Sequence, residues 1–358
     1  MCTLMIYFFI LLGVVSYTTK ASLATIELPP NVSFPAVFVF GDSIMDTGNN
    51  NNNMKTYARC NFLPYGKDFN GGIPTGRFCN GKVPSDYIVE ALGIKEFLPA
   101  YLDPNIQPSD LVTGVCFASG GSGYDPLTSK SASAISLSGQ IILFKEYIGK
   151  LKGIVGEGRK NFILANSVFL VVQGSNDISN TYFLSHLREL QYDVPSYTDL
   201  MLASASNFLK EIYQLGARRI GVLSIPPIGC VPFQRTVVGG IERKCAEKIN
   251  DACKLFNTKL SKELSSLNRN LPNTRMVYLD VYYPLLDIIL NYQNYGYKVV
   301  DKGCCGTGAV EVAVLCNQFA TQCEDVRDYV FWDSFHPSES VYSKLLNPLL
   351  RKYIHQFF

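Results

Sequence analysis

Three histidines limit where this sequence can perform general acid-base chemistry near neutral pH: His186, His336 and His355. His336 stands out because Asp333 precedes it by three residues, within reach of the imidazole Nδ1-H on a tight turn. Pro337 disfavours a helical conformation at His336 and so keeps that turn open. This segment indicates a base and the carboxylate that orients it, although a structural turn explains the same residues equally well.

A serine nucleophile follows the first buried apolar run after residue 35. Residues 36–40 lead directly into Gly41-Asp42-Ser43, which places Ser43 beyond the carboxyl end of a predicted strand. Open α/β sheets bind their ligands at that edge, and Gly41 permits a sharp turn there. The Gly-x-Ser-x-Gly elbow of α/β-hydrolases is absent, so that fold is not supported. Taken alone, Gly-Asp-Ser is also an ordinary turn tripeptide.

Two further turns supply groups that can bind a developing negative charge. The apolar run 168–172 leads into Gly174-Ser175-Asn176-Asp177, where the side-chain amide of Asn176 can donate to an oxyanion. A glycine-rich turn around Gly121 follows another apolar run, and its backbone N–H groups can face an anion. Phosphate binding is disfavoured because no Gly-Lys-Ser/Thr follows. A flexible turn is the alternative reading.

The elements that must position these residues alternate between short apolar runs and longer amphipathic ones. This pattern is typical of a parallel sheet covered by helices, in one domain without internal repeats. Strands are predicted at 36–40, 111–117, 168–172, 220–224 and 276–280. Helices are predicted at 84–92, 137–151, 197–215, 245–267, 283–292 and 338–355, the last with Ser338 as N-cap.

Two segments are long and polar. The five asparagines at 49–53 predict an irregular surface loop, because such a run is unsuited to a core and suits turns. The segment 301–325 carries four cysteines and little regular structure. A loop of that length in a compact domain is normally stapled or functional.

The composition points to a globular chain in an oxidising compartment. The 358 residues are 47% hydrophobic and 17% charged, with Lys+Arg 32 against Asp+Glu 30, which argues against disorder and against nucleic-acid binding. Eleven cysteines occur without a C-x-x-C or H-E-x-x-H motif, so disulfides are favoured over a metal cluster. Adjacent Cys304 and Cys305 are expected to reach different partners, with Cys316 and Cys323 the nearest; Cys230 with Cys245 is a further expected pair.

The N-terminus predicts secretion. Residues 4–15 are an unbroken apolar run shorter than a membrane span, and no charged side chain precedes Lys20. We therefore expect a removed signal peptide at 1–24, a catalytic domain at 34–356 and no stable transmembrane segment afterwards. The sequon Asn31-Val32-Ser33 makes Asn31 a candidate glycosylation site.

Four blocks in this order resemble the GDSL (SGNH) esterase/lipase family. They are Gly41-Asp42-Ser43, the Gly121 turn, Gly174-Ser175-Asn176-Asp177, and Asp333 with His336. Further stretches are similar to the plant branch of the family, among them 226–232, 303–308 and 331–337, and segments 64–69 and 76–78 resemble its extracellular-lipase subgroup. The resemblance implies a single-domain, flavodoxin-like three-layer α/β/α fold with a five-stranded parallel sheet, matching the five strands predicted above.

The resemblance also implies roles for individual residues. Ser43 corresponds to the nucleophile, His336 to the base and Asp333 to the residue that orients it. The N–H groups of Ser43 and Gly121 and the amide of Asn176 correspond to the oxyanion hole, with no cofactor and no metal. Cys116 stands where the family usually has Asn, which implies a weaker hold on the Gly121 turn.

The function implied is a secreted serine esterase/lipase that hydrolyses carboxylic esters of lipids or acylated metabolites. The subgroup is associated with floral and pollen-coat tissue, so the cell wall and the pollen coat are the candidate locations. Two alternatives stay open at this point: an acyltransferase that uses the same triad, and an inactive secreted coat or binding protein.

Overall fold

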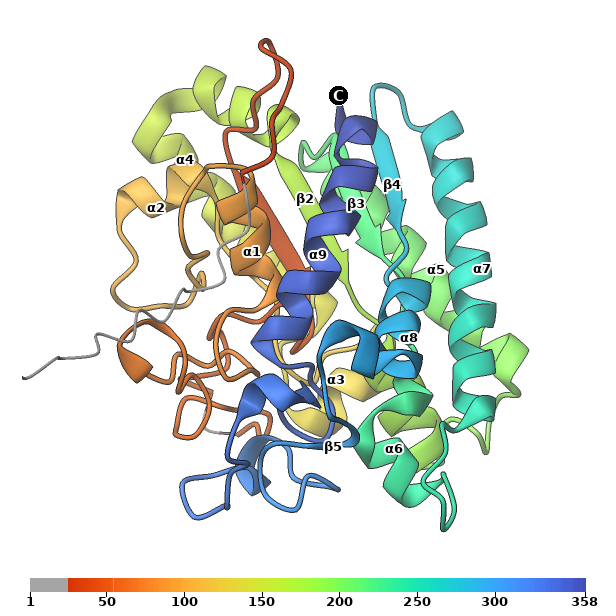
Figure 1. The fold of residues 1–358 in the computed structure, drawn as a ribbon. Coiled ribbons are helices and arrows are strands. Elements are labelled where there is room, and N and C mark those ends of the chain that lie inside the picture. Colours follow the sequence, from red (N-terminus) through yellow and green to blue (C-terminus); the bar gives the residue numbers. More distant parts are fainter. Residues whose placement is uncertain (1–24, 54) are drawn as a thin grey trace, which may run out of the picture.

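A parallel β-sheet forms the centre of the molecule in the computed structural model, which describes residues 25–53 and 55–358 (Figure 1). Its strands are β1 (Val37–Gly41), β2 (Val168–Val172), β3 (Arg219–Leu223) and β4 (Arg275–Leu279). They pair in the order β1-β2-β3-β4, with Phe38 beside Phe169 and Ile220 beside Met276. These four strands were predicted within one residue at each end.

The fifth predicted strand, 111–117, is largely wrong. Residues Pro108–Thr113 form helix α2, whose first turn is closed by the Asp110 carboxylate accepting from Gln107 N at 3.1 Å. After Gly114, at φ +99°, the chain runs extended beside β1 but makes a ladder bridge only at Cys116. This short edge segment still completes the flavodoxin-like order, because it flanks β1 on the side away from β2.

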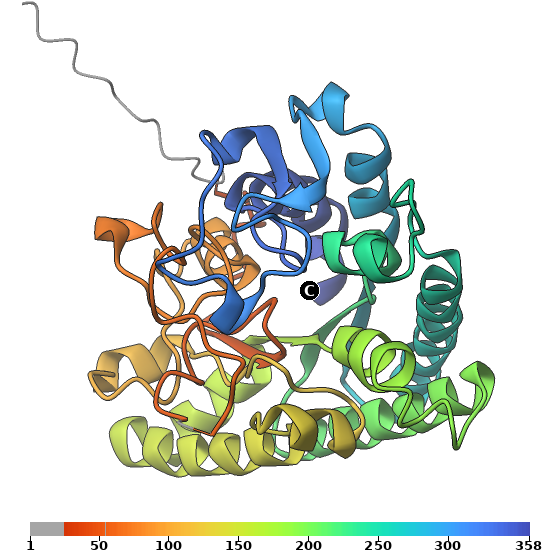
Figure 2. The ribbon, with the colours of Figure 1, turned by 90° about the horizontal axis from the view of Figure 1, so that it is seen from below.

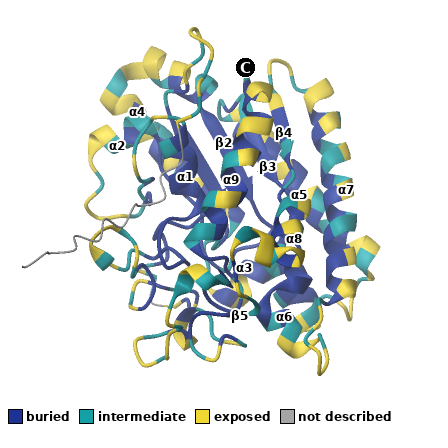
Figure 3. Ribbon diagram, viewed as in Figure 1, coloured by how far each residue is buried: buried dark blue, intermediate teal, exposed yellow. Residues whose placement is uncertain are grey.

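Helices cover both faces of the sheet and give three layers (Figures 1 and 3). Residues on one face, such as Phe38, Phe169 and Ile220, pack with α4 (Leu137–Asn166), α5 (Val194–Gln214) and α7 (Glu247–Asn270). Their neighbours on the other face, such as Val39 and Leu170, pack with α1 (Pro84–Ala91) and α9 (Glu339–Tyr353). All residues of β1 and β2 are buried, as expected for strands covered on both sides. The single-domain α/β prediction is therefore confirmed.

The remaining elements extend this frame. The helices are α1 (Pro84–Ala91), α2 (Pro108–Thr113), α3 (Pro126–Ala132), α4 (Leu137–Asn166), α5 (Val194–Gln214), α6 (Pro232–Val237), α7 (Glu247–Asn270), α8 (Tyr282–Leu290) and α9 (Glu339–Tyr353). A π-helix spans Asp177–Leu184, and β5 (Val299–Gly303) pairs with β6 (Tyr329–Phe331). Helix α4 continues beyond the predicted end at residue 151, with a break at Gly156, where φ is +77°. The prediction stopped at 151 because the rest of the helix is largely exposed and carries no apolar periodicity to mark it. Ser338 occupies the N-cap position of α9, but its hydroxyl donates to Tyr329 O instead.

Among the described residues there are three disulfides: Cys230–Cys245, Cys304–Cys323 and Cys305–Cys316. The first was predicted, and the other two confirm that Cys304 and Cys305 reach different partners, with the choice between Cys316 and Cys323 set by the structure. The last two staple the long loop 301–325. Asn31 is exposed on a turn, while the predicted signal peptide and Cys2 lie outside the described residues. Within the described ranges, no helix is long and apolar enough to cross a membrane.

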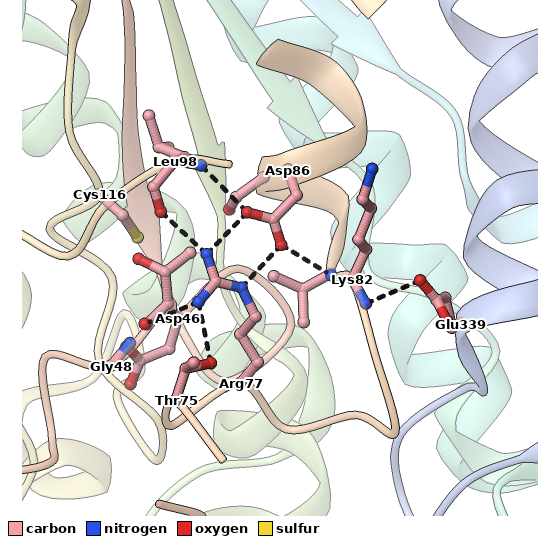
Figure 4. A network of polar contacts seen from close by, with 12 residues as sticks. Asp46, Gly48, Thr75, Arg77, Lys82, Asp86, Leu98, Cys116 and Glu339 are labelled. Carbon is pink, nitrogen blue, oxygen red and sulfur yellow. Dashed lines mark hydrogen bonds and ion pairs between the residues drawn. The ribbon is translucent and has the colours of Figure 1, made fainter. Parts of the chain in front are cut away.

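A buried ion pair holds the loops that follow β1 (Figure 4). Arg77 binds both carboxylate oxygens of Asp86 on α1 at 2.7 Å and donates to Thr75 Oγ1 and to the carbonyls of Thr47 and Leu98. Because the guanidinium reaches all four partners at once, it fixes the chain just downstream of Ser43 against α1.

Candidate active site

Ser43, His336 and Asp333 form one hydrogen-bonded chain at the carboxyl edge of the sheet. The distance from Ser43 Oγ to His336 Nε2 is 2.8 Å, and His336 Nδ1 lies 2.8 Å from Asp333 Oδ2. Residues 293 positions apart are thus brought together by the end of β1 and the turn before α9. An imidazole placed between a hydroxyl and a carboxylate can take the hydroxyl proton while the carboxylate stabilises the imidazolium.

The position of Ser43 depends on Gly41 at the end of β1. Gly41 has φ +146°, and a Cβ there would lie 2.2 Å from Val172 O of the neighbouring strand. A side chain would therefore push β1 away from β2 at the point where the chain turns. Asp42 continues the turn by accepting from Ile44 N at 3.0 Å.

The Asp333 carboxylate is fully buried and has several donors besides the imidazole. Oδ1 accepts from Phe335 N at 2.8 Å and from His336 N at 2.7 Å, so the backbone of the same turn orients it. Oδ2 accepts from the hydroxyl of Tyr65 at 2.7 Å.

The sequence-based prediction missed Tyr65, the distant side chain that contacts Asp333. The Tyr65 hydroxyl also accepts from Ala313 N at 2.8 Å, so it joins the disulfide-stapled loop to Asp333. The only signal was its place in the segment 64–69 that resembles the extracellular-lipase subgroup. Nothing in the order of residues pairs position 65 with position 333.

The residues that carry the three expected oxyanion donors, Ser43, Gly121 and Asn176, line one cavity together with His336. Within the described part of the chain, the backbone N–H groups of Ser43 and Gly121 make no hydrogen bond. Asn176 uses one amide hydrogen on Ser122 O, at 2.9 Å, and its Oδ1 accepts from Asn180 Nδ2 at 3.1 Å. These contacts fix the orientation of the amide and leave its second hydrogen for a ligand.

The prediction that the asparagine run is a surface loop is wrong for two of its members. Asn49 and Asn50 are both buried, and each amide satisfies its donors on backbone carbonyls. Asn50 Nδ2 donates to Ala58 O at 2.7 Å and to Gly120 O at 2.9 Å, and its Oδ1 accepts from Ser119 Oγ. A primary amide can replace missing backbone partners in this way, so the run packs against the glycine-rich turn instead of solvent.

Asp46 holds the same turn from its other side. Its Oδ2 accepts from Gly120 N at 2.9 Å, and its Oδ1 accepts from Gly48 N and Asn49 N. The Cys116 thiol points elsewhere and donates to Met45 O at 3.2 Å. The turn is therefore held by Asp46 and Asn50, and a cysteine at position 116 removes none of these contacts.

Three buried carboxyl groups near the site have raised pKa values. Desolvation raises the pKa of Asp42 to about 7 and those of Asp46 and Asp177 to about 6, each opposed in part by hydrogen bonds. Asp42 Oδ2 has no hydrogen-bond partner among the described residues, which agrees with a proton on this group in mildly acidic solution.

The cavity has a volume of about 450 Å³. Most of its lining is apolar, and it opens over the hydroxyl of Ser43. Among the described residues, no cluster of His, Cys, Asp and Glu is arranged to hold a metal ion. The arrangement can therefore bring an ester carbonyl to a serine, a base and three N–H donors.

The fold is that of an SGNH-type hydrolase, and residues 37–349 match the family described as GDSL-like Lipase/Acylhydrolase. The chain belongs to that family. It is 56% identical over 337 residues to the GDSL esterase/lipase EXL3 of Arabidopsis thaliana, covering 94% of this chain and 92% of that protein. It is 52% identical over 345 residues to EXL2 of the same plant, covering 92% and 91%. The chain is thus a carboxylic ester hydrolase, as predicted.

Proposed function

We propose that Ser43, His336 and Asp333 hydrolyse carboxylic esters through an acyl-enzyme. The observation that carries the proposal is the continuous hydrogen-bonded chain from Ser43 Oγ to the Asp333 carboxylate beside an apolar cavity. Ser43 Oγ attacks the carbonyl carbon while His336 Nε2 takes its proton. The C–O bond to the alcohol then breaks, and the alcohol leaves with the proton from His336.

Water completes the cycle by the same route. His336 takes a proton from the water, the hydroxide attacks the acyl carbon, and Ser43 Oγ leaves with the proton. In both steps the carbonyl oxygen becomes negative beside the N–H groups of Ser43 and Gly121 and the amide of Asn176. One such donor stabilises the transition state by about 3 kcal/mol.

Hydrolysis of p-nitrophenyl butyrate tests these roles. Ser43→Ala and His336→Ala should each lose nearly all turnover, and Asp333→Asn should lose less because backbone N–H groups also support the turn. Circular dichroism checks that each variant is folded, and Ser265→Ala on the exposed face of α7 is the control. Full activity of Ser43→Ala, or a larger loss in Asp333→Asn than in His336→Ala, would contradict the roles.

Glycerol added to the assay distinguishes hydrolysis from transfer, because transfer yields an acylglycerol.

We also propose that the protein is secreted after removal of a signal peptide at residues 1–24. The catalytic domain then spans residues 34–356, and the protein acts outside the cell, in the cell wall or the pollen coat. Three disulfides and an exposed Asn31 support this location. When the full chain is expressed in plant cells, the protein should appear in the culture medium. Its mass should fall on treatment with a glycosidase that removes N-linked glycans. Asn31→Gln should show no such fall, and retention of the wild type inside the cell would contradict secretion.

A further inference from the structure

Five apolar side chains that line the cavity over Ser43 form what we call the apolar arm: Val231, Leu285, Ile289, Phe335 and Leu345. Tyr342 on α9 also lines the cavity, and its hydroxyl is the polar group next to this arm. The five apolar side chains belong to a single apolar cluster formed by α8, α9 and the turns before α6 and α9. Side chains of this kind offer no hydrogen bond to a ligand, so a hydrocarbon chain is the group they accommodate best.

The opposite side, which we call the polar arm, is rich in hydroxyl and amide groups. It is lined by Ser131 on α3 and by Ser175, Ser179, Asn180 and Ser185 on and beside the π-helix. Figure 2 looks onto the end of the molecule where these elements lie.

Two hydroxyls of the polar arm are available to a ligand. The side chains of Ser131 and Ser175 make no hydrogen bond within the described residues, and neither residue is buried. Thr128 and Thr181, also in the lining, bond to each other at 2.7 Å and join α3 to the π-helix. The exposed Leu184 and Leu187 are the apolar exceptions on this side.

The charges around the cavity restrict the alcohol further. No Lys or Arg is among the described residues that line it, and the only carboxyl group there is that of Asp42. A phosphate or carboxylate on the substrate would therefore find no cation to pair with and would lose its hydration.

We propose that the substrate class is a neutral monoester of an unbranched fatty acid with a polyhydroxylated alcohol such as glycerol or a sugar. The acyl chain lies in the apolar arm, and the hydroxyls of the alcohol bind in the polar arm. The inference rests on the proposed ester hydrolysis and goes beyond it in naming both halves of the ester.

Three esters with the same acyl group test the alcohol: 1-monolauroylglycerol, ethyl laurate and lauroyl lysophosphatidate, each as a monomer in solution, below its solubility limit or micellar concentration. We expect kcat/KM for the glycerol ester to exceed the other two at least tenfold. Equal or better hydrolysis of ethyl laurate or of the phosphate ester overturns the proposal. In that case, p-nitrophenyl butyrate separates the two proposals. If the wild type hydrolyses it and Ser43→Ala does not, the proposed ester hydrolysis stands and only the substrate class is wrong.

A pair of variants tests the polar arm directly. Ser131→Val should lower the ratio of kcat/KM for the glycerol ester to that for ethyl laurate several-fold, because it removes a free hydroxyl from the lining. Ser265→Val, a matched change on the exposed face of α7, should leave the ratio as in the wild type. An unchanged ratio in Ser131→Val contradicts the assignment.

Acyl-chain length tests the apolar arm. In the wild type, kcat/KM for monoacylglycerols should rise about two- to fourfold per methylene from butyrate toward laurate. Ile289→Phe narrows the arm and should move the preferred chain to a shorter length, with circular dichroism as the check on folding. If kcat/KM of the wild type does not change with acyl-chain length, the acyl chain does not bind in the apolar arm, and this conclusion does not depend on whether the variant folds.

Discussion

Asp333 is the residue whose surroundings say most about how the site is held. Its two oxygens accept from two backbone N–H groups and the imidazole of its own turn and from the Tyr65 hydroxyl. A carboxylate with this many donors keeps one orientation, and the imidazole that it binds does the same. The Tyr65 contact is the one that comes from a distant part of the chain.

Tyr65→Phe should lower kcat about tenfold and leave KM near its wild-type value. The change removes one hydrogen bond to a charged group, which contributes about 1.5–3 kcal/mol, while the backbone donors to Asp333 remain. Steady-state kinetics on p-nitrophenyl butyrate, with the pH profile of kcat, measure the effect.

Tyr87→Phe is the matched control for this variant. Tyr87 is also buried, and its hydroxyl donates to Glu339 O at 3.4 Å, outside the candidate triad. Its kcat should stay close to that of the wild type. Equal losses in both variants would mean that Tyr65 acts only through general stability.

At the scale of elements, the asparagine run holds the glycine-rich turn that carries Gly121. Asn50 reaches Gly120 O and Ala58 O, whereas Asn52 in the same run is exposed. The run and the turn are about 70 residues apart in the sequence, yet they form one hydrogen-bonded unit.

Asn50→Asp should destabilise the protein by about 2 kcal/mol or more and lower kcat. The carboxylate cannot donate to the two carbonyls that Asn50 now satisfies, and it would be buried beside them. Thermal unfolding and kinetics on p-nitrophenyl butyrate measure both effects. Asn52→Asp, at an exposed position, should change neither, and equal behaviour of the two variants would refute the role of Asn50.

The stapled loop 301–325 is the second element that shapes the site. Residues 312–315 line the cavity, and Ala313 N donates to Tyr65, so the disulfides hold both the pocket wall and the Asp333 contact. The double variant Cys305→Ser, Cys316→Ser should lose about 3 kcal/mol of stability and show a raised KM. The double variant Cys230→Ser, Cys245→Ser is the comparison. If KM rises equally in both double variants, the loop 301–325 has no specific role in shaping the cavity.

The accuracy of the sequence-based prediction follows from how local each signal is. The strand 168–172 and the Asp333-x-x-His336 turn were found because their residues alone define them. The strand at 111–117 was misassigned because an apolar run does not distinguish a strand from a short helix followed by an edge segment. Tyr65 and Asn50 act on partners about 268 and 70 residues away, and no local pattern reveals such contacts.

Considered over the whole molecule, buried carboxyl groups lie together at the carboxyl edge of the sheet, where burial disfavours their charged form. Asp42, Asp46 and Asp177 all follow β1 or β2 at their carboxyl ends, and burial raises the pKa of each. The folded protein therefore binds protons there that the unfolded chain releases above pH 4. Their contribution to stability is present at low pH and is lost as the pH rises toward 7.

Asp42→Asn should weaken this dependence of stability on pH. The amide mimics the protonated acid, so the variant should lose less stability than the wild type between pH 5 and pH 7. One carboxyl group contributes a slope of up to about 1.4 kcal/mol per pH unit in that window. Urea unfolding at several pH values measures the slopes, and parallel curves for the two proteins would contradict the buried, protonated state of Asp42.

Covalent labelling with a serine-directed probe distinguishes a nucleophilic Ser43 from an ordinary surface serine. A fluorophosphonate reacts with an activated serine, and peptide mass spectrometry locates the adduct. We expect one adduct, on Ser43, in the wild type, greatly slowed labelling in His336→Ala and no labelling in Ser43→Ala. An adduct on another residue, or labelling of Ser43→Ala at the wild-type rate, would contradict the role of Ser43 as the nucleophile.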